Sequence, residues 1–319
     1  MNMINTSPLV SVIIPTYNRA SVICATLDDV FRQTYTNFEV IVVDDASSDD
    51  TRKQISQYRA PVRFVRLDRN SGPSAARNKG LELAAGEIIA FQDSDDRWNP
   101  TKLERQVNLL QRAGESVSCC ISNALLRSWK GAARYSFDIA GIHPSYPEGL
   151  WLNPAEVLAT GGLFFNQAVA VRRSAIDAVG GFDPSFRQLE DWDLALRLAL
   201  LGGAWAFISE PLVTWNPGSD LSLTAVGLGD PIRLCENSVR LLDNILASLN
   251  GSEQSKIKRL LESKLRTSQR ELESLRALRT PSSSRRAWVT LLSYVERSRR
   301  FLYRRSPMFP RMLTSPLSD

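Results

Sequence analysis

The sequence is poor in histidine and cysteine, the residues that most often complete zinc sites in proteins. There is one histidine, His143, and the four cysteines are Cys24, Cys119, Cys120 and Cys235. Because the cysteines lack metal-ligand spacing, the sequence argues against a zinc centre and predicts reduced thiols in the core. The scarcity of histidine also argues against histidine acid–base catalysis, so carboxylates are the expected catalytic groups.

Long apolar segments are missing as well. No run reaches the about 18 residues that a helix needs to cross a bilayer, and residues 1–8 lack a signal-peptide pattern. We therefore expect a cytoplasmic protein. Glycine (17) and proline (16) are too few for a collagen-like or linker-dominated chain, and a hydrophobic fraction of 43% is typical of a folded protein. At about 150 residues per domain, the 319 residues indicate about two domains.

Positive charge is distributed unevenly. The net charge is +5, yet residues 251–319 contain 16 Lys and Arg against 6 Asp and Glu, whereas residues 1–250 contain 23 against 28. A protein that binds nucleic acid along its folded body concentrates positive charge there, so no nucleic-acid partner is expected. The basic C-terminal segment fits contact with phosphate or with an anionic membrane.

Two interpretations of that basic segment stay open. Arginines within residues 285–311 are interleaved with leucine and aromatic side chains. An arginine-rich helix of this kind can lie at a membrane interface, which would attach the protein peripherally to the inner face of the membrane. Alternatively, the apolar side chains pack on the folded body or on a second subunit while the arginines remain in water.

The first 110 residues alternate short β-branched runs with helical patterns, which is typical of consecutive βαβ units. Strands are predicted at residues 9–14, 38–43, 62–67, 87–92 and, less regularly, 163–171; helices are predicted at residues 74–85, 190–201 and from 231 onward. The fold class is therefore α/β, with a mostly parallel central sheet flanked by helices and a C-terminal helical extension.

A polar cluster follows each of the first predicted strands. The clusters are residues 15–18, 44–49, 68–72 and 93–96. Because parallel strands point the same way, these clusters should meet at one edge of the sheet, where open α/β sheets bind ligands.

Carboxylates within these clusters suggest two binding roles. Asp93 and Asp95 lie in one turn, and such hard oxygen ligands suit Mg2+ or Mn2+ with substrate phosphates filling the open positions; the alternative is a turn that caps the next helix. Asp45 could accept a hydrogen bond from a base or a ribose, or belong to a cluster that caps the helix beginning near residue 49.

Charged residues also open two predicted helices. Glu190, Asp191 and Asp193 lie in a first helical turn, where acidic residues favour the helix dipole. If one of them lies near Asp93, it could be a general base instead. Arg77 lies early on the helix that follows a Gly-Pro pair, where it could meet a diphosphate or simply be solvated.

Taken together, the order and spacing of these motifs resemble the motif series of family 2 glycosyltransferases. The segments are SVIIPTYNR (11–19), VVDDASSD (42–49), NSGPSAARNKG (70–80), FQDSDD (91–96) and EDWDLALR (190–197). The resemblance covers about residues 8–222 and implies a GT-A fold over residues 1–225, with a nucleotide-binding half at about 8–115 and an acceptor half at about 116–225. Residues 226–319 would be a helical, basic extension.

The resemblance also implies residue roles. The nucleotide would be bound by Pro15, Thr16, Tyr17, Asn18, Asp45, Arg77 and Asp93, with Asp45 at the base. Asp93 and Asp95 match the D-x-D pair for Mg2+ or Mn2+, with Asp95 in direct contact with the metal. Asp191 matches the catalytic base. Relatives often carry a histidine in a segment like residues 212–219, where this chain has Asn216, so a third contact to metal or phosphate is expected to be missing.

The implied activity is inverting, metal-dependent transfer of a sugar from a nucleotide-diphosphate sugar, expected to be a UDP-sugar, to an acceptor hydroxyl. The acceptor would be a saccharide or a lipid-linked molecule in cell-surface polysaccharide or glycoconjugate synthesis. One alternative is a nucleotidyltransferase, although residues 15–18 lack its Gly-rich, basic loop. The other is a non-catalytic nucleotide-sugar-binding protein, which should have lost Asp95 or Asp191.

Overall fold

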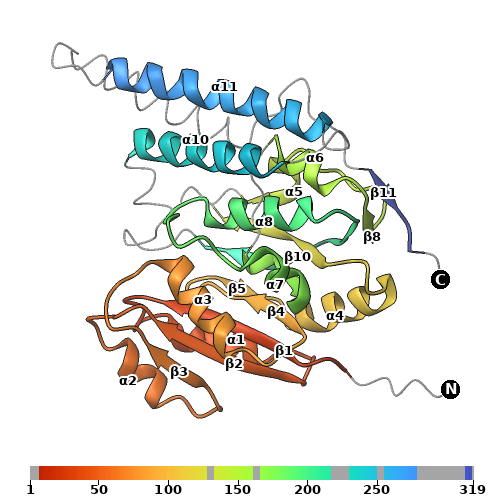
Figure 1. The fold of residues 1–319 in the computed structure, drawn as a ribbon. Helices are drawn as coiled ribbons and strands as arrows, with labels where there is room; N and C mark the ends of the chain where they lie inside the picture. Colours follow the sequence, from red (N-terminus) through yellow and green to blue (C-terminus); the bar gives the residue numbers. More distant parts are fainter. Residues whose placement is uncertain are drawn as a thin grey trace.

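The computed structural model describes residues 7–127, 133–160, 166–216, 230–249, 255–278 and 313–317, in which helices surround a central sheet (Figure 1). The strands are β1 (Val10–Thr16), β2 (Phe38–Asp44), β3 (Arg63–Arg66), β4 (Ile88–Phe91), β5 (Arg97–Trp98), β6 (Cys119–Arg127), β7 (Ala133–Tyr135), β8 (Glu148–Trp151), β9 (Val169–Arg172), β10 (Trp205–Trp215) and β11 (Thr314–Ser315). The helices are α1 (Ile23–Phe31), α2 (Thr51–Ser56), α3 (Pro73–Leu83), α4 (Lys102–Ala113), α5 (Ser136–Ile139), α6 (Pro154–Leu158), the 3-10 helix η1 (Asn166–Ala168), α7 (Arg173–Val179), α8 (Glu190–Leu200), α10 (Pro231–Ser248) and α11 (Ser255–Leu278).

The first part of the sheet is parallel, as the βαβ pattern predicted. Its strands lie in the order β3-β2-β1-β4, with Thr16 opposite Asp44 at the ends of β1 and β2. Alternate residues of β2 enter two cores: Val40 and Val42 join the core that contains α1, whereas Ile41 packs in a separate cluster with Ala76 of α3. Helices on both faces therefore explain why β1 and most of β2 are buried apolar runs.

The second part of the sheet is mixed. Strand β9 is antiparallel to both β4 and β6, and β6 is parallel to β10. The predicted α/β class is confirmed, with the antiparallel pairs confined to the later strands. The strand predicted at residues 163–171 begins only at Val169, after η1, and residues 161–165 lie outside the described part.

The C-terminal helices α10 and α11 lie side by side above α8 (Figure 1). Leu241, Leu242 and Ile245 of α10 and Leu261 of α11 are buried in the main core, so these helices pack on the body. None of the described helices is long and apolar enough to span a bilayer. The arginine-rich residues 285–311, for which membrane contact or packing was predicted, lie outside the described residues.

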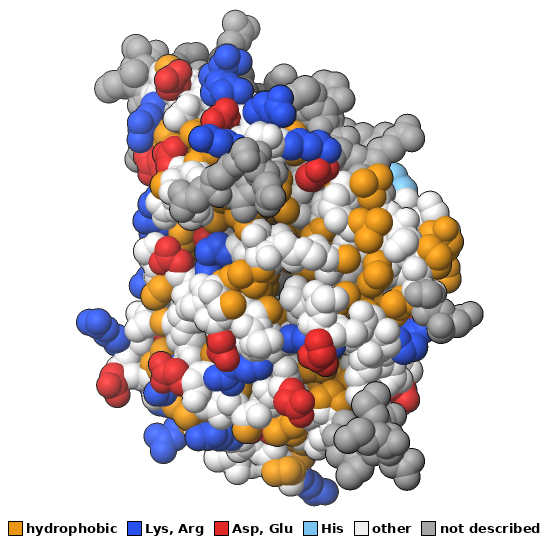
Figure 2. Space-filling view, turned by 45° about the vertical axis from the view of Figure 1, so that its right-hand side comes forward, with side chains coloured by type: hydrophobic (Ala, Val, Ile, Leu, Met, Phe, Trp, Pro, Cys, Tyr) orange, Lys and Arg blue, Asp and Glu red, His pale blue; other side chains and the backbone are white. Residues whose placement is uncertain are grey.

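The chain returns to the sheet near its end. Strand β11 pairs with the edge strand β8, and Leu152 N donates a hydrogen bond to Leu313 O at 2.8 Å. Figure 2 shows charged side chains of both signs spread over one face of the molecule, whereas hydrophobic side chains gather on its right-hand side. Of the four cysteines, Cys119, Cys120 and Cys235 are buried free thiols, as predicted, and Cys24 is half-buried.

Candidate functional site

The loops that follow β1 and β2 are joined by Asn18. Its backbone adopts a left-handed conformation (φ 52°), its N–H donates to Ser47 Oγ at 2.9 Å, and its Oδ1 accepts from Ser48 N at 2.8 Å. Beside it, Tyr17 is exposed, whereas Thr16 is buried and its hydroxyl has no hydrogen-bond partner among the described residues. A buried hydroxyl without a partner is costly, so this edge of the sheet has an unused polar group that a ligand could satisfy.

Asp45 connects the end of β2 to the loop before α3. Its two carboxylate oxygens accept hydrogen bonds from the backbone N–H groups of Ser71, at 2.7 Å, and Gly72, at 2.8 Å. Gly72 has φ 91°, a conformation that favours glycine, and Pro73 then begins α3. The neighbouring Asp44 is buried and pairs with Arg66 at 3.1 Å. Neither aspartate caps α2, because Asp49 accepts from Thr51 N instead.

Arg77 of α3 bridges two carboxylates from distant parts of the chain. Its Nη2 lies 2.7 Å from Asp93 Oδ1 and its Nη1 lies 2.9 Å from Glu190 Oε1. The side chain is only 4% exposed, and its guanidinium lies over the Phe182 ring, 5.4 Å from the centroid. Burial opposes the charge, yet the two carboxylates outweigh it and raise the pKa of Arg77. Arg77 therefore joins the loop after β4 to the beginning of α8.

The loop after β4 crowds carboxylates together. Asp95 Oδ2 lies 3.2 Å from Arg19 Nη2, and the Asp95 side chain remains 24% exposed. Asp96 is buried and accepts from Gln167 Nε2 at 2.8 Å and from Asn216 N at 3.2 Å. Burial, and next the charge of Asp93, raise the pKa of Asp95, and burial with the charges of both neighbours raises the pKa of Asp96 well above its usual range.

This donor set fits a divalent cation held jointly with a ligand. No group of three or more metal-ligating side chains occurs within the described residues. Mg2+, however, is commonly held by one or two carboxylates together with substrate phosphates and water. The crowding of Asp93 and Asp95 is the kind of repulsion that a dication relieves.

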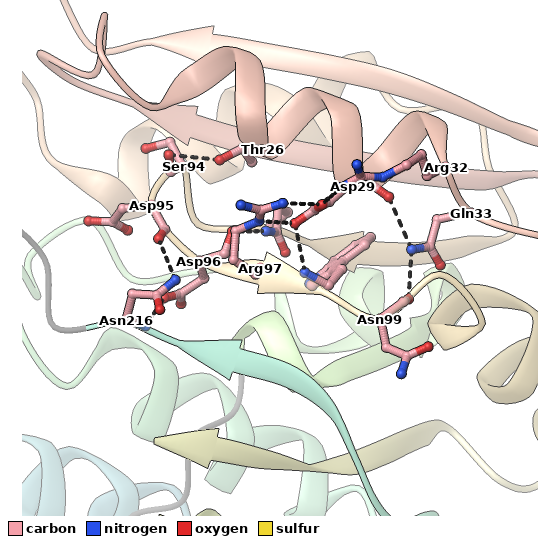
Figure 3. Close-up of polar contacts among 12 residues, drawn as sticks. Thr26, Asp29, Arg32, Gln33, Ser94, Asp95, Asp96, Arg97, Asn99 and Asn216 are labelled. Atoms are coloured by element: carbon pink, nitrogen blue, oxygen red, sulfur yellow. Dashed lines mark hydrogen bonds and ion pairs between the residues drawn. The ribbon is translucent and has the colours of Figure 1, made fainter. Parts of the chain in front are cut away.

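Asn216 lies in the segment where the sequence predicted that a histidine contact is missing. Its side-chain Nδ2 lies 3.5 Å from the backbone oxygen of Asp95, and its N–H contacts Asp96 (Figure 3). Asn216 thus contacts the loop that carries the carboxylates. The single histidine, His143, lies on the surface with Nδ1 3.5 Å from Asp138 Oδ1.

Asp191 lies in the first turn of α8, after Leu189 with its left-handed backbone (φ 65°). Its Oδ1 accepts from the N–H of Trp192 at 2.8 Å. Burial, and next the negative charge of Glu190, raise the pKa of Asp191 to about 7. Burial also raises the pKa of Asp193, but the Asp193 carboxylate pairs with Arg197 on the next turn at 2.5 Å. Asp191 is thus the acid of this turn whose pKa suits proton transfer near neutral pH.

The loop before α8 is held from two sides. Ser74 Oγ of α3 donates to Phe186 O at 2.8 Å. Arg240 of α10 donates to Ser185 O at 2.9 Å, and its guanidinium lies over the Phe186 ring, 4.3 Å from the centroid. The C-terminal extension therefore contacts the segment that leads to Asp191.

The structure brings together most of the residues that the sequence suggested and adds others. Arg77, Asp93 and Glu190 form one connected group, and Asp45 fixes the loop before the Arg77 helix. The sequence reasoning gave no role to Arg19 or Gln167, each of which contacts the aspartate-rich loop. Arg19 lies within the first motif, but nothing in its sequence position indicates the direction of its side chain.

Comparisons with known proteins agree with the motif series. Residues 11–164 match the family described as Glycosyl transferase family 2. The chain is 33% identical over 195 residues, 60% of this chain and 70% of the relative, to WfaP of Escherichia coli, a UDP-Glc:alpha-D-GlcNAc-diphosphoundecaprenol beta-1,3-glucosyltransferase. Across four bacterial relatives that include WfaP, the aligned part covers between 41% and 70% of the relative's own length.

Solved structures with the same fold cover nearly the whole chain. S. aureus TarS 1-349 in complex with UDP-GlcNAc matches 92% of this chain and 89% of its own with a TM-score of 0.66 and 21% identity. The mannosyltransferase PcManGT from Pyrobaculum calidifontis, in complex with GDP-Man and Mn2+, matches 92% of this chain and 81% of its own with a TM-score of 0.59 and 20% identity. At such identities the likeness concerns the fold.

Proposed function

The chain belongs to glycosyl transferase family 2, as its motifs predicted, and on that premise we propose that it transfers a sugar from a UDP-sugar to a hydroxyl group with inversion at the anomeric carbon. The fold is of the GT-A type. We assign this activity to residues 1–225, with the nucleotide bound by residues 8–115 and the acceptor by residues 116–225.

One observation carries the proposal. Arg77 contacts Asp93 on one side and Glu190 on the other, and Glu190 adjoins Asp191 in the chain. Arg77 therefore connects Asp93, which is suited to the diphosphate end of a donor, to the helical turn that carries Asp191. The carboxylate of Asp191 is suited to take a proton. A transferase needs both groups around the same anomeric carbon.

In the proposed reaction, the ionised carboxylate of Asp191 accepts the proton of the acceptor hydroxyl. The acceptor oxygen forms a bond to the anomeric carbon while the bond between that carbon and the diphosphate oxygen breaks, and UDP leaves with the bonding electrons. This single displacement inverts the configuration and needs no covalent enzyme intermediate. The pKa of Asp191, about 7, lets the group accept a proton and release it again near neutral pH.

The donor side is assigned to the loops at the sheet edge. Thr16 offers a buried hydroxyl that has no hydrogen-bond partner within the described part of the chain. We assign Asp45, the residue after β2, to the base, and Tyr17 is exposed beside Thr16. We also assign to the nucleotide site Pro15, which precedes Thr16 within β1, and Asn18, which joins the loops after β1 and β2. Asp93 and Asp95 would hold Mg2+ or Mn2+, which offsets the negative charge that develops on the leaving diphosphate. The Mn2+ in the PcManGT complex supports this assignment.

The relatives suggest the class of both substrates. WfaP uses UDP-Glc and an acceptor linked to diphosphoundecaprenol, and TarS has been crystallised with UDP-GlcNAc. We therefore assign a UDP-hexose as donor and a lipid-linked saccharide of cell-surface polysaccharide synthesis as acceptor. A lipid-linked acceptor also gives the basic residues 285–311 a role in peripheral membrane contact.

The experiment is a transfer assay with UDP-Glc, UDP-GlcNAc and UDP-Gal, Mn2+, and a diphospholipid carrying one N-acetylglucosamine as acceptor. We expect acceptor-dependent release of UDP and a new glycosidic bond whose anomeric configuration, read by proton NMR, is opposite to that of the donor. Retention of configuration would contradict the single displacement. Release of UDP without a glycosidic product would contradict the acceptor class.

A further inference from the structure

One face of helix α1 contacts the segment that runs from Ser94 to Trp98. The hydroxyl of Thr26 is buried and donates to the backbone oxygen of Ser94 at 2.9 Å (Figure 3). Ser94 lies between Asp93 and Asp95, the carboxylates assigned to the metal. The contact therefore fixes the backbone at the middle of the D-x-D pair.

Asp29, one turn further along α1, holds the residues that follow the pair. Its side chain is only 3% exposed. Oδ1 accepts from Arg97 Nη2 at 2.7 Å, and Oδ2 accepts from Arg97 Nε and from the backbone N–H of Trp98, the latter at 3.2 Å (Figure 3). A carboxylate buried to this degree stays ionised only when charged and hydrogen-bonding partners compensate its lost hydration. Here the partners are Arg97 and Trp98, which follow the D-x-D pair, and Arg32 at the end of α1.

Gln33, two residues after the end of α1, contacts the next part of the segment. Its Nε2 donates to Asn99 O at 2.8 Å, and its Oε1 accepts from Leu103 N at 3.0 Å. Positions 26 and 29 share one face of α1, since residues three apart are neighbours on a helix, and Gln33 lies just past the end of α1. Helix α1 and the residue Gln33 that follows it thus contact successive parts of residues 94–103.

We propose that Asp29 and Thr26 are positioning residues for the metal-binding carboxylates, a role that rests on the proposed function. Asp93 and Asp95 repel each other when both are ionised, so a loop that carries them tends to separate them unless its backbone is fixed elsewhere. Thr26 fixes it between the two aspartates, and Asp29 fixes it immediately after them. The side chains of α1 hold the carboxylates close enough to bind one ion together.

The test compares Asp29→Asn with Asp28→Asn in the full-length protein. Asp28 is the adjacent acid on the same helix, but it is exposed and contacts Tyr58 Oη at 2.7 Å. Mn2+ affinity in the presence of UDP is measured by electron paramagnetic resonance, and UDP affinity without metal by calorimetry. Because groups that orient metal ligands typically contribute about 10-fold to 100-fold in metal affinity, we expect Asp29→Asn to bind Mn2+ about 10-fold more weakly. UDP affinity without metal should be unchanged, and Asp28→Asn should match the wild type in both measurements.

A second pair of variants covers the case in which Asp29→Asn does not fold. Thr26→Val keeps the side-chain shape and removes the donor, whereas Thr26→Ser keeps the hydroxyl. We expect Mn2+ to bind about fivefold more weakly to Thr26→Val, because one net hydrogen bond is lost. Thr26→Ser should bind Mn2+ nearly as the wild type does. Equal Mn2+ affinity in Thr26→Val and Thr26→Ser would overturn the positioning role. So would a loss of metal-free UDP affinity in Thr26→Val as large as its loss of Mn2+ affinity. Absence of Mn2+-dependent UDP binding in the wild type would overturn the proposed function itself.

Discussion

The guanidinium of Arg77 donates to Asp93 from Nη2 and to Glu190 from Nη1, although Arg77 and Glu190 are 113 residues apart in the chain. This bridge connects the loop after β4 to the first turn of α8. In the proposed function it sets the distance between the groups at the diphosphate and the catalytic base.

Arg77→Lys tests the bridge. A lysine keeps the positive charge but cannot contact both carboxylates with the fixed geometry of a guanidinium. We expect a loss of about 1–3 kcal/mol in the free energy of unfolding, since a buried hydrogen-bonding partner is left unsatisfied, together with a lower kcat. Urea denaturation and the transfer assay measure the two effects. Arg59→Lys, at an exposed arginine between α2 and β3, is the control and should change neither. Equal stability and kcat in both variants would show that the bridge is unimportant.

Much of this arrangement could be predicted from local sequence. The β-branched runs around Val12 and Val42 predicted strands, and the polar clusters after them predicted a shared sheet edge, because parallel strands end together. The pairing of Asp193 with Arg197 also has a local signal, the i to i+4 spacing. That spacing predicts an ion pair for Asp193, and it could have excluded Asp193 as the base and left Glu190 and Asp191 as candidates.

Contacts between distant segments could not be predicted in the same way. The direction of Arg19 toward Asp95 depends on how the loop after β1 crosses the loop after β4. The burial of Asp96 depends on Gln167 and Asn216, which arrive from η1 and from the end of β10. No periodicity within one segment encodes such contacts, because they depend on how the two halves pack.

Asp95→Ala tests the metal assignment. Removing the carboxylate leaves Asp93 as the remaining member of the pair, so Mn2+-dependent UDP binding should be lost while the circular dichroism spectrum is unchanged. Calorimetry with UDP, with and without Mn2+, is the measurement. Asp243→Ala removes an exposed aspartate of α10 and should bind as the wild type does. Unchanged UDP affinity of Asp95→Ala in the presence of Mn2+ would rule out Asp95 as a ligand.

The pKa of Asp191 predicts the pH dependence of the reaction. Burial and the charge of Glu190 raise this pKa to about 7, and only the ionised carboxylate accepts a proton. The kcat/KM is therefore expected to rise with pH and to level off above about 7, as measured in a buffer series at constant ionic strength. A kcat/KM that does not change between about pH 5 and about pH 8 would count against Asp191 as the base.

Stability should respond in the opposite direction. The unfolded chain releases the Asp191 proton near a pKa of about 3.9, whereas the folded protein retains it until about 7. The folded state therefore binds more protons over this interval, and its free energy of unfolding falls as pH rises. Asp191→Asn should reduce that fall, which urea denaturation at several pH values would detect.

Membrane contact, one of the two open interpretations of the basic C-terminal segment, predicts binding to anionic membranes. Replacing Arg297, Arg299 and Arg300 by Gln in the full-length chain keeps β11 and should weaken sedimentation with phosphatidylglycerol liposomes on the order of 100-fold, at about 1 kcal/mol per basic residue. The control variant replaces Lys258, Arg266 and Arg270, which are exposed on α11 and carry the same total charge. Equal weakening in both variants would indicate general charge attraction rather than docking by this segment.

The most direct test of the proposed active site is the turnover of Asp191→Asn. The amide keeps the shape of the side chain but cannot take the acceptor proton, so we expect kcat to fall about 100-fold or more while Mn2+-dependent UDP binding is retained. Asp177→Asn, at an exposed aspartate of α7 that pairs with Arg173, should turn over normally. Near-normal transfer by Asp191→Asn would contradict the account and would make Glu190 or Asp193 the next candidate for the base.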